Sequence, residues 1–254
     1  MSAQQIWQDF KSKNKPFQFK ESYNSVIPLN IFQTWHIKRL PPYMLKCAKN
    51  IKRMNPQFQY HLFDNKDCYY FIKANFPEEV ANAYSSLIPK AYKSDLWRYC
   101  VLYKLGGIYL DIKYKCTNNF NFMALTEQEY FVKDFDNSGG GTYNALIVAK
   151  PGNSILLNCI NDIVENVRNK YYGPSSLSPT GPLLLGKYST KEEKDSWSLT
   201  VDASEIKNVM HAVYFVYNGT IILGFKYDEY YTQQKAQPKY VSYGTLWTNK
   251  QVYR

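Results

Sequence analysis

The stretch SDLWRYCVLYKLGGIYLDI, residues 94–112, decides the fold. Ser94 belongs to the residue types that cap helix N-termini, and the apolar run behind it ends at Gly106 and Gly107, a pair that favours a helix stop. We therefore expect a buried helix of about three turns starting at Ser94. Residues 108–112 follow at once and are apolar enough for a strand in the centre of a sheet. The helix thus delivers the chain into the interior of the sheet.

Patterns on either side extend this stretch into an alternation of strands and helices. Upstream, we expect strands at 26–35 and 58–63, and helices at 43–54, 66–75 and 78–86. Downstream, we expect strands at 130–133 and 143–148, a helix at 154–171, and a β-hairpin at 213–225 that turns at Asn218-Gly219. Such an alternation is typical of a layered α/β domain with a mixed, mostly parallel sheet flanked by helices.

Composition and charge exclude several classes of protein. With 45% hydrophobic and 17% aromatic residues, the chain is not of the disordered class. Its formal charge of +10 suits an anionic partner, such as a phosphate-bearing cofactor, nucleic acid or an acidic membrane face. The basic residues are scattered, however, and the densest group is Lys46, Lys49, Lys52 and Arg53. A dispersed lysine-rich surface explains most of the charge, and we expect no nucleic-acid partner.

Cysteine usage and hydropathy suggest a compartment. The 5 cysteines are odd in number and widely spaced, without a CxxC pair, so they indicate neither a disulfide framework nor a zinc site. No apolar run approaches the roughly eighteen residues of a membrane span, and residues 1–20 do not read as a signal peptide. We expect a soluble, cytoplasmic protein without a transmembrane segment, for which peripheral membrane contact stays open.

Asp95 and Arg98 form a charged pair near the start of the expected helix. They are three residues apart, so their side chains share one face of the helix. The carboxylate can accept and the guanidinium can donate hydrogen bonds, which suits adjacent hydroxyls of a sugar. A local ion pair with an aspartate well placed at a helix N-terminus is the alternative. The pair alone does not decide between them.

A second charged group lies on the strand behind the two glycines. Side chains alternate along a strand, so Tyr109, Asp111 and Lys113 are expected on one face. Asp111 and Lys113 would then be roughly 7 Å apart, a separation suited to the ribose and diphosphate of a nucleotide sugar. The carboxyl edge of an open α/β sheet is also where ligands bind. The alternative is a surface ion pair at a strand end, which contributes little.

These residues, in this order, resemble glycosyltransferase family 32, which also contains yeast mannosyltransferases. The family's I-P-x-x-I-x-Q-T-W signature is matched by Ile27, Pro28, Ile31, Gln33, Thr34 and Trp35. Its A-x-x-S-D-x-x-R-Y-x-x-L-Y and G-G-x-Y-x-D motifs are matched over 91–103 and 106–111. Asn144 before 149–152, and Thr180-Gly181-Pro182, resemble two weaker motifs. Four motifs in the right order over most of the chain form a strong signal.

The resemblance implies a GT-A-like, Rossmann-like fold that moves a hexose from a nucleotide-diphosphate sugar to a hydroxyl of a glycan or glycoconjugate, with retention of configuration. It implies donor-binding roles for Gln33, Trp35, Asp95, Arg98, Tyr109, Asn144 and Trp247 and a catalytic role for Asp111. We expect Lys113, two residues further along, to be the second catalytic residue. The resemblance also implies one domain over 1–254, with an N-terminal arm (1–25), a nucleotide-sugar-binding core (26–150), and an acceptor-side part with a mobile closing segment (151–254).

Lys113 departs from the family pattern. Family members complete an Asp-x-Asp pair whose second carboxylate binds a divalent cation, whereas this chain has Lys113 at that position. A charged lysine cannot ligate Mn²⁺ or Mg²⁺, which require oxygen ligands. Either Asp111 and the donor phosphates hold the metal with an unrecognised group, or the Lys113 ammonium replaces it. The third alternative is an inactive GT-A relative that binds a sugar or nucleotide.

Overall fold

The computed structural model describes residues 2–135, 139–206 and 210–254, which include two four-stranded sheets. The first sheet has the order β2-β1-β3-β5, formed by β2 (Gln59–Phe63), β1 (Asn30–Thr34), β3 (Gly107–Leu110) and β5 (Leu146–Ala149). β1 pairs in parallel with β2 and with β3, and β5 runs antiparallel to β3. The mixed, mostly parallel sheet that the sequence predicted is confirmed.

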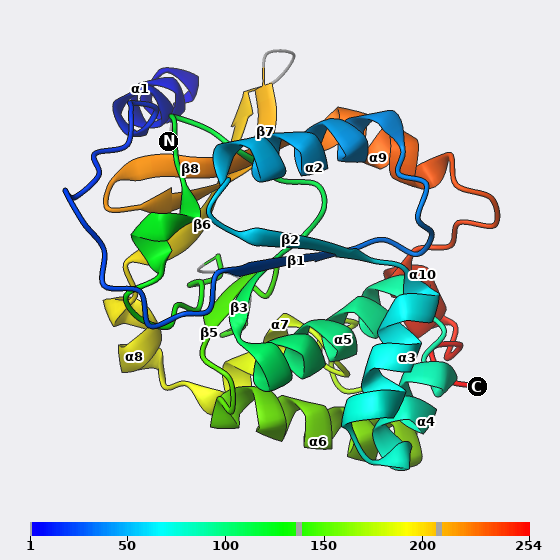
Figure 1. Cartoon of the computed structure of the whole chain (residues 1–254). Helices are drawn as coiled ribbons and strands as arrows, with labels where there is room; N and C mark the ends of the chain where they lie inside the picture. Colours follow the sequence, from blue (N-terminus) through cyan, green and yellow to red (C-terminus); the bar gives the residue numbers. More distant parts are fainter. Residues whose placement is uncertain (1, 136–138, 207–209) are drawn as a thin grey trace.

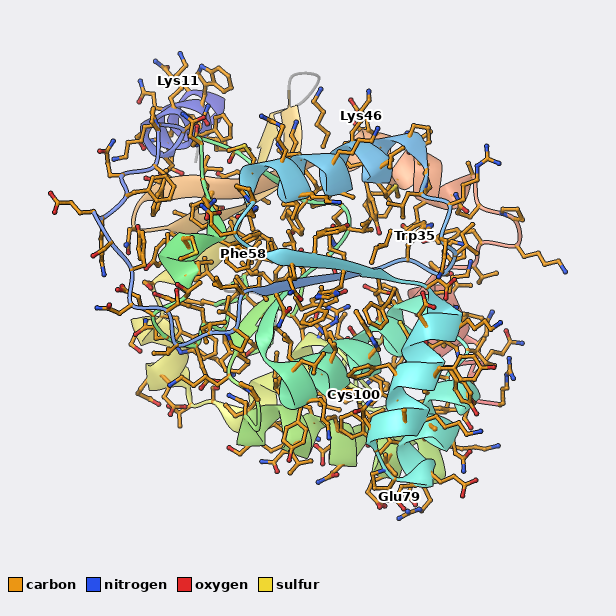
Figure 2. All side chains as sticks on the ribbon, in the orientation of Figure 1. Lys11, Trp35, Lys46, Phe58, Glu79 and Cys100 are labelled. Atoms are coloured by element: carbon orange, nitrogen blue, oxygen red, sulfur yellow. The ribbon has the colours of Figure 1, made fainter. Side chains whose placement is uncertain are left out.

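Helices cover both faces of this sheet (Figure 1). On one side lie α3 (Asn65–Asn75), α4 (Glu78–Ser86), α5 (Lys90–Leu105) and α6 (Ser154–Arg168). On the other side lies α2 (Pro42–Met54), with α9 (Tyr227–Lys235) next to it. Figure 2 shows the same layering in the side chains, with Phe58 and Cys100 turned inward and Lys46 and Glu79 extending outward.

The sheet separates two hydrophobic cores, because its strands alternate their side chains between the two faces. Ile108 and Leu110 of β3 pack in the core on the α2 side. Tyr109, between them, packs in the core with α5 and α6. Gly107 opens the strand at φ 119°, and a Cβ there would lie 2.7 Å from the Asn30 carbonyl oxygen. Glycine is therefore what lets β3 approach β1 so closely.

The second sheet is antiparallel, with the order β4-β8-β7-β6, and it packs on the α2-side core. Its strands are β4 (Lys115–Cys116), β8 (Thr220–Lys226), β7 (Met210–Tyr217) and β6 (Leu199–Ile206). β7 and β8 form the predicted hairpin, with Asn218 and Gly219 at φ 49° and 67° as a type I′ turn requires. α1 (Ala3–Lys13) lies against β6. The described residues also form three short helices, α7 (Pro182–Leu185), α8 (Lys191–Ser196) and α10 (Tyr243–Thr248).

Several predicted boundaries are wrong. α5 begins at Lys90, with Pro89 at the N-cap position and no side-chain capping hydrogen bond. Ser94 lies inside the helix, where its hydroxyl donates to the Lys90 carbonyl oxygen (3.0 Å). The strand behind the glycines ends at Leu110 instead of residue 112. Residues 130–133 form only isolated bridges. Within the described part of the chain, no helix has the length and apolarity that crossing a membrane requires.

Candidate active site

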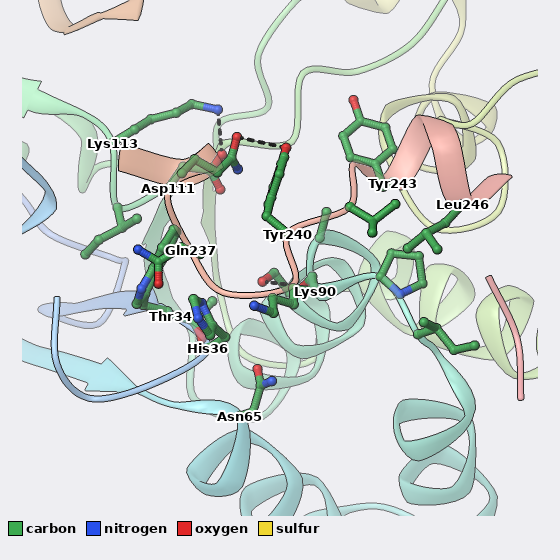
Figure 3. A pocket seen from close by; sticks show the side chains of 18 of the residues that line it. Thr34, His36, Asn65, Lys90, Asp111, Lys113, Gln237, Tyr240, Tyr243 and Leu246 are labelled. Carbon is green, nitrogen blue, oxygen red and sulfur yellow. Dashed lines mark hydrogen bonds and ion pairs between the residues drawn. The ribbon is translucent and has the colours of Figure 1, made fainter. Parts of the chain in front are cut away.

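A cavity of about 290 Å³ lies at the carboxyl ends of β1 and β3 (Figure 3). Three parts of the fold line it: the ends of the two strands, the N-terminal ends of α3 and α5, and the C-terminal segment from α9 to α10. Its lining includes Thr34, Trp35, His36, Asn65, Lys90, Ser94, Arg98, Tyr109, Asp111, Lys113, Tyr230, Gln237, Lys239, Tyr240, Tyr243 and Leu246. This edge of a parallel sheet is where ligands bind in open α/β folds.

Asp111 is the centre of a charged cluster on the cavity wall. Its Oδ2 lies 3.0 Å from Lys113 Nζ, and its Oδ1 lies 3.4 Å from Arg98 Nη1. The Tyr109 hydroxyl donates to Oδ1 over 2.9 Å. Burial alone would raise the pKa of Asp111, but the charges of Lys113 and Arg98 outweigh it, so the pKa lies below its ordinary value. The carboxylate is therefore ionised at neutral pH.

The backbone behind β3, and not strand alternation, places Lys113 beside Asp111. The Asp111 N–H donates to the Ala145 carbonyl oxygen (2.8 Å), which holds the first residue after the strand. The Tyr114 N–H then donates to the Asp111 carbonyl oxygen (3.2 Å), closing a turn. That turn brings the Lys113 side chain back over Asp111. The sequence predicted that Asp111 and Lys113 would share one face of the strand, but both lie beyond its end, and the turn brings them together.

Asp95 and Arg98 are buried side by side, in the second and third turns of α5. Arg98 is 4% exposed and Asp95 is 6% exposed, and Arg98 Nη2 lies 3.1 Å from Asp95 Oδ1. Arg98 also lies over the Tyr109 ring, 4.3 Å from its centroid, and it reaches the cavity. Asp95 does not line the cavity. The expectation that the pair lies at the helix start is wrong, because α5 begins one turn earlier.

Asp95 is held from all sides by neutral donors and by Arg98. The Thr180 hydroxyl donates to Oδ2 (2.7 Å) and the Asn144 side-chain amide donates to Oδ1 (2.9 Å). Burial raises the pKa of Asp95 above its ordinary value, although Arg98 and the hydrogen bonds oppose it. The Asn144 carbonyl oxygen also accepts a hydrogen bond from Arg98. Asn144 and Thr180, from the two downstream motifs, therefore contact the helix motif behind the cavity. There they position Arg98.

Gln33, Trp35 and Trp247 are placed differently from one another. Gln33 is fully buried, and its amide donates to the carbonyl oxygens of Leu110 (3.2 Å) and Asp111 (3.3 Å). It joins β1 to the end of β3 and does not line the cavity. Trp35 does line it. Trp247 is not among the lining residues, and its indole N–H donates to the Tyr172 carbonyl oxygen (2.7 Å).

Sequence reasoning missed several cavity residues. His36 follows directly on the Gln-Thr-Trp motif, a position that could have suggested it. Burial, with a smaller effect of Lys90, lowers the pKa of His36 to about 4, so the imidazole is neutral at pH 7. Tyr230 and Tyr240 come from the C-terminal segment, which Figure 3 shows passing along the cavity near Asp111. Its many aromatic residues gave only a general signal.

The residues present do not fit a divalent cation held by a carboxylate pair. Across residues 2–135, 139–206 and 210–254, no three His, Cys, Asp or Glu side chains gather as a metal-binding group. The Asp111 carboxylate is engaged by Lys113, Arg98 and Tyr109. A metal ion needs several oxygen ligands, and here the second position of the pair carries an ammonium.

Comparisons with known proteins point to glycosyltransferases. Residues 41–132 match the family described as "Glycosyltransferase sugar-binding region containing DXD motif". Inositol phosphoceramide mannosyltransferase 3 of Schizosaccharomyces pombe is 25% identical over 205 residues, which are 78% of this chain and 56% of that protein. The initiation-specific alpha-1,6-mannosyltransferase of Candida albicans is 30% identical over 102 residues, covering 38% and 26% of the two chains. The chain thus spans about half or less of the length of these relatives.

A solved structure supports the fold. The PaToxG glycosyltransferase superposes with a TM-score of 0.51 at 18% identity, covering 72% of this chain and 73% of that one. The resemblance to family 32 glycosyltransferases and the GT-A-like fold are both confirmed. The expected cytoplasmic location is wrong, because the yeast relatives are Golgi mannosyltransferases.

Proposed function

We propose that this chain, which resembles the family 32 glycosyltransferases, transfers a hexose from a nucleotide-diphosphate sugar to a hydroxyl of a glycan or glycolipid acceptor. The observation that carries the proposal is the joining of Arg98 and Asp111 in a cavity at the carboxyl edge of the parallel sheet. The relatives are named as mannosyltransferases, one acting on inositol phosphoceramide, so mannose is the first hexose to test.

The proposed donor lies along the charged wall of the cavity. Asp111 presents a carboxylate whose side chain is 23% exposed, which suits hydroxyl groups of the ribose or the sugar. Arg98 also lines the cavity, and its guanidinium lies over the Tyr109 ring. Trp35 and Tyr243 offer flat faces on which the base or the sugar can stack.

The proposed reaction exchanges one bond at the anomeric carbon for another. The bond from that carbon to the diphosphate oxygen breaks, and the diphosphate leaves with the electron pair. The acceptor oxygen bonds to the same carbon, and its proton passes to the departing diphosphate. Within the described residues, Asp111 is the one carboxylate in the cavity lining, and it is held by two cations. We therefore propose retention by attack from the leaving-group face, without a covalent sugar-enzyme intermediate.

The test is calorimetry with GDP-mannose, other GDP sugars and UDP sugars, followed by transfer assays on glycan and glycolipid acceptors. We expect one donor to bind and to raise the melting temperature. Asp111→Asn should abolish binding, whereas Asp162→Asn, which removes an exposed pair with Lys187, should not. The proposal fails if no nucleotide sugar binds the folded chain. Binding without transfer to any acceptor would instead identify an inactive relative that binds the donor.

A further inference from the structure

The Lys113 side chain is a confined cation in the cavity wall. Its side chain is 17% exposed, and its ammonium lies 3.0 Å from Asp111 Oδ2. The same residue lines the cavity, and Figure 3 shows the ion pair beside it. A lysine that served only as an ion-pair partner of Asp111 at a strand end would extend into the solvent. Here it is enclosed by the rest of the fold.

Aromatic rings form the enclosure. The ammonium lies 5.4 Å from the Tyr114 ring centroid, 5.3 Å from that of Phe225 and 5.6 Å from that of Tyr230. These rings belong to the turn behind β3, to β8 and to α9, so the second sheet and the C-terminal segment jointly fix the cation. Cation–π contacts of this kind strengthen when water is excluded. Burial opposes the charge, yet Tyr143, Asp111 and Tyr230 raise the pKa of Lys113 well above its ordinary value.

The charges around the cavity favour an anionic ligand. In the part of the lining that the structure describes, four cationic side chains (Lys90, Arg98, Lys113 and Lys239) face one carboxylate, Asp111. An excess of positive charge in a partly enclosed site attracts anions strongly. A diphosphate carries the negative charge that would balance this positively charged lining. A divalent cation, by contrast, would have to compete with Lys113 and Arg98 for the same carboxylate.

We propose that the Lys113 ammonium is a built-in cation for the donor diphosphate, standing where DXD glycosyltransferases have a second carboxylate. The proposal rests on the proposed function and deepens it, since it makes donor binding independent of a divalent metal. When the bond from the anomeric carbon to the diphosphate oxygen breaks, the ammonium keeps its own protons and offsets the charge that grows on that oxygen. A positive charge fixed in place before the reaction stabilises such a transition state.

The experiment measures GDP and UDP binding to the whole chain by calorimetry, in EDTA and in Mn²⁺. We expect affinities within about threefold of each other under the two conditions, because the site supplies its own positive charge. Lys113→Met, which keeps the length of the side chain, should weaken binding in EDTA by at least about tenfold. Lys115→Ala removes a charge two residues further along, outside the cavity lining, and should leave binding unchanged. Lys113→Arg, which keeps the charge, should retain part of the affinity.

Two results would overturn the inference in different ways. Binding that is lost in EDTA and restored by Mn²⁺ would show that a metal ion, and not Lys113, balances the charge of the diphosphate. The proposed function would then still stand. Absence of GDP and UDP binding under both conditions, with the protein folded by circular dichroism, would remove the proposed function as well. Should Lys113→Met not fold, Lys113→Asp supplies the family pair. Its binding should then depend on Mn²⁺, and metal-independent binding equal to that of the unaltered chain would contradict the inference.

Discussion

Arg98 joins helix α5 to the end of strand β3 through Asp111, with 3.4 Å between Arg98 Nη1 and Asp111 Oδ1. The same guanidinium contacts Asp95 and the Asn144 carbonyl oxygen, so its position is fixed from behind. A planar group with several fixed donors can serve these acceptors at once. The orientation of the cavity carboxylate therefore depends on a side chain from the neighbouring helix.

Arg98→Lys tests this dependence. An ammonium cannot reach both carboxylates and the Asn144 carbonyl oxygen in one plane, so we expect a loss of about 2–3 kcal/mol in the free energy of unfolding. Urea denaturation measures it. Arg168→Lys is the control, since Arg168 pairs with Glu165 on the surface and should change stability by less than about 0.5 kcal/mol. Equal effects of the two changes would mean that the bridging geometry contributes nothing.

Asp95→Asn separates positioning from direct sugar binding. Because Asp95 is buried and lies behind Arg98, we expect the change to cost about 3–5 kcal/mol of stability, as when one partner of a buried ion pair is removed. Thermal unfolding without a nucleotide measures the stability of the variant. The rise in melting temperature when a nucleotide is added measures its binding. A variant with normal stability but altered donor selectivity would restore a direct role for Asp95 in sugar recognition.

Gly107→Ala tests the close approach of β3 to β1. An added Cβ would lie 2.7 Å from the Asn30 carbonyl oxygen, which is backbone and cannot move aside cheaply. Gly152→Ala is the matched control, because Gly152 also has a positive φ of 76° but has no atom within 4 Å of the added Cβ. We expect Gly107→Ala to be less stable than Gly152→Ala by about 1–3 kcal/mol in denaturant titrations. Equal losses would assign the whole effect to backbone strain.

The sequence predicted those parts of the fold that local patterns determine. The hydrophobic runs of β1, β2 and β3 and the spacing of α2 and α6 are local, and so is the Asn218-Gly219 turn. Helix starts were less predictable, because two signals compete there. Ser94 resembles a cap, but the chain is already helical from Lys90 and the Ser94 hydroxyl binds back to the Lys90 carbonyl oxygen.

The candidate site was predictable only where it is built from consecutive elements. The helix and the strand end that follows it directly supply Arg98, Asp111 and Lys113. Because consecutive elements pack together, the order of these residues in the sequence predicts that they lie close in space. Tyr230 and Tyr240 enter the cavity only because the C-terminal segment folds back over the sheet edge. Such tertiary contacts leave no periodic pattern, and the same holds for the burial of Asp95 by Thr180 and Asn144.

His36 should give the protein a measurable acid sensitivity. Its pKa falls from 6.5 to about 4 on folding, so the unfolded chain takes up the proton first as the pH drops. Its contribution to stability is complete above about pH 6.5 and is lost between about 6.5 and 4. We expect His36→Gln to lose less melting temperature between pH 7 and 4.5 than the unaltered chain. His61→Gln is the comparison variant, since burial lowers the pKa of His61 too. An unchanged slope of melting temperature against pH in His36→Gln would contradict the prediction.

Tyr243 and Trp247 lie on the same short helix, α10, but only Tyr243 lines the cavity. If the proposed donor stacks on this wall, Tyr243→Ala should weaken GDP or UDP binding about threefold to tenfold, the range expected for the loss of one aromatic contact. Trp247→Phe removes the hydrogen bond to the Tyr172 carbonyl oxygen. It should cost about 1 kcal/mol of stability and leave the affinity unchanged. Calorimetry and thermal unfolding on both variants distinguish the roles, and weaker nucleotide binding in Trp247→Phe alone would reverse the assignment and return Trp247 to the donor site.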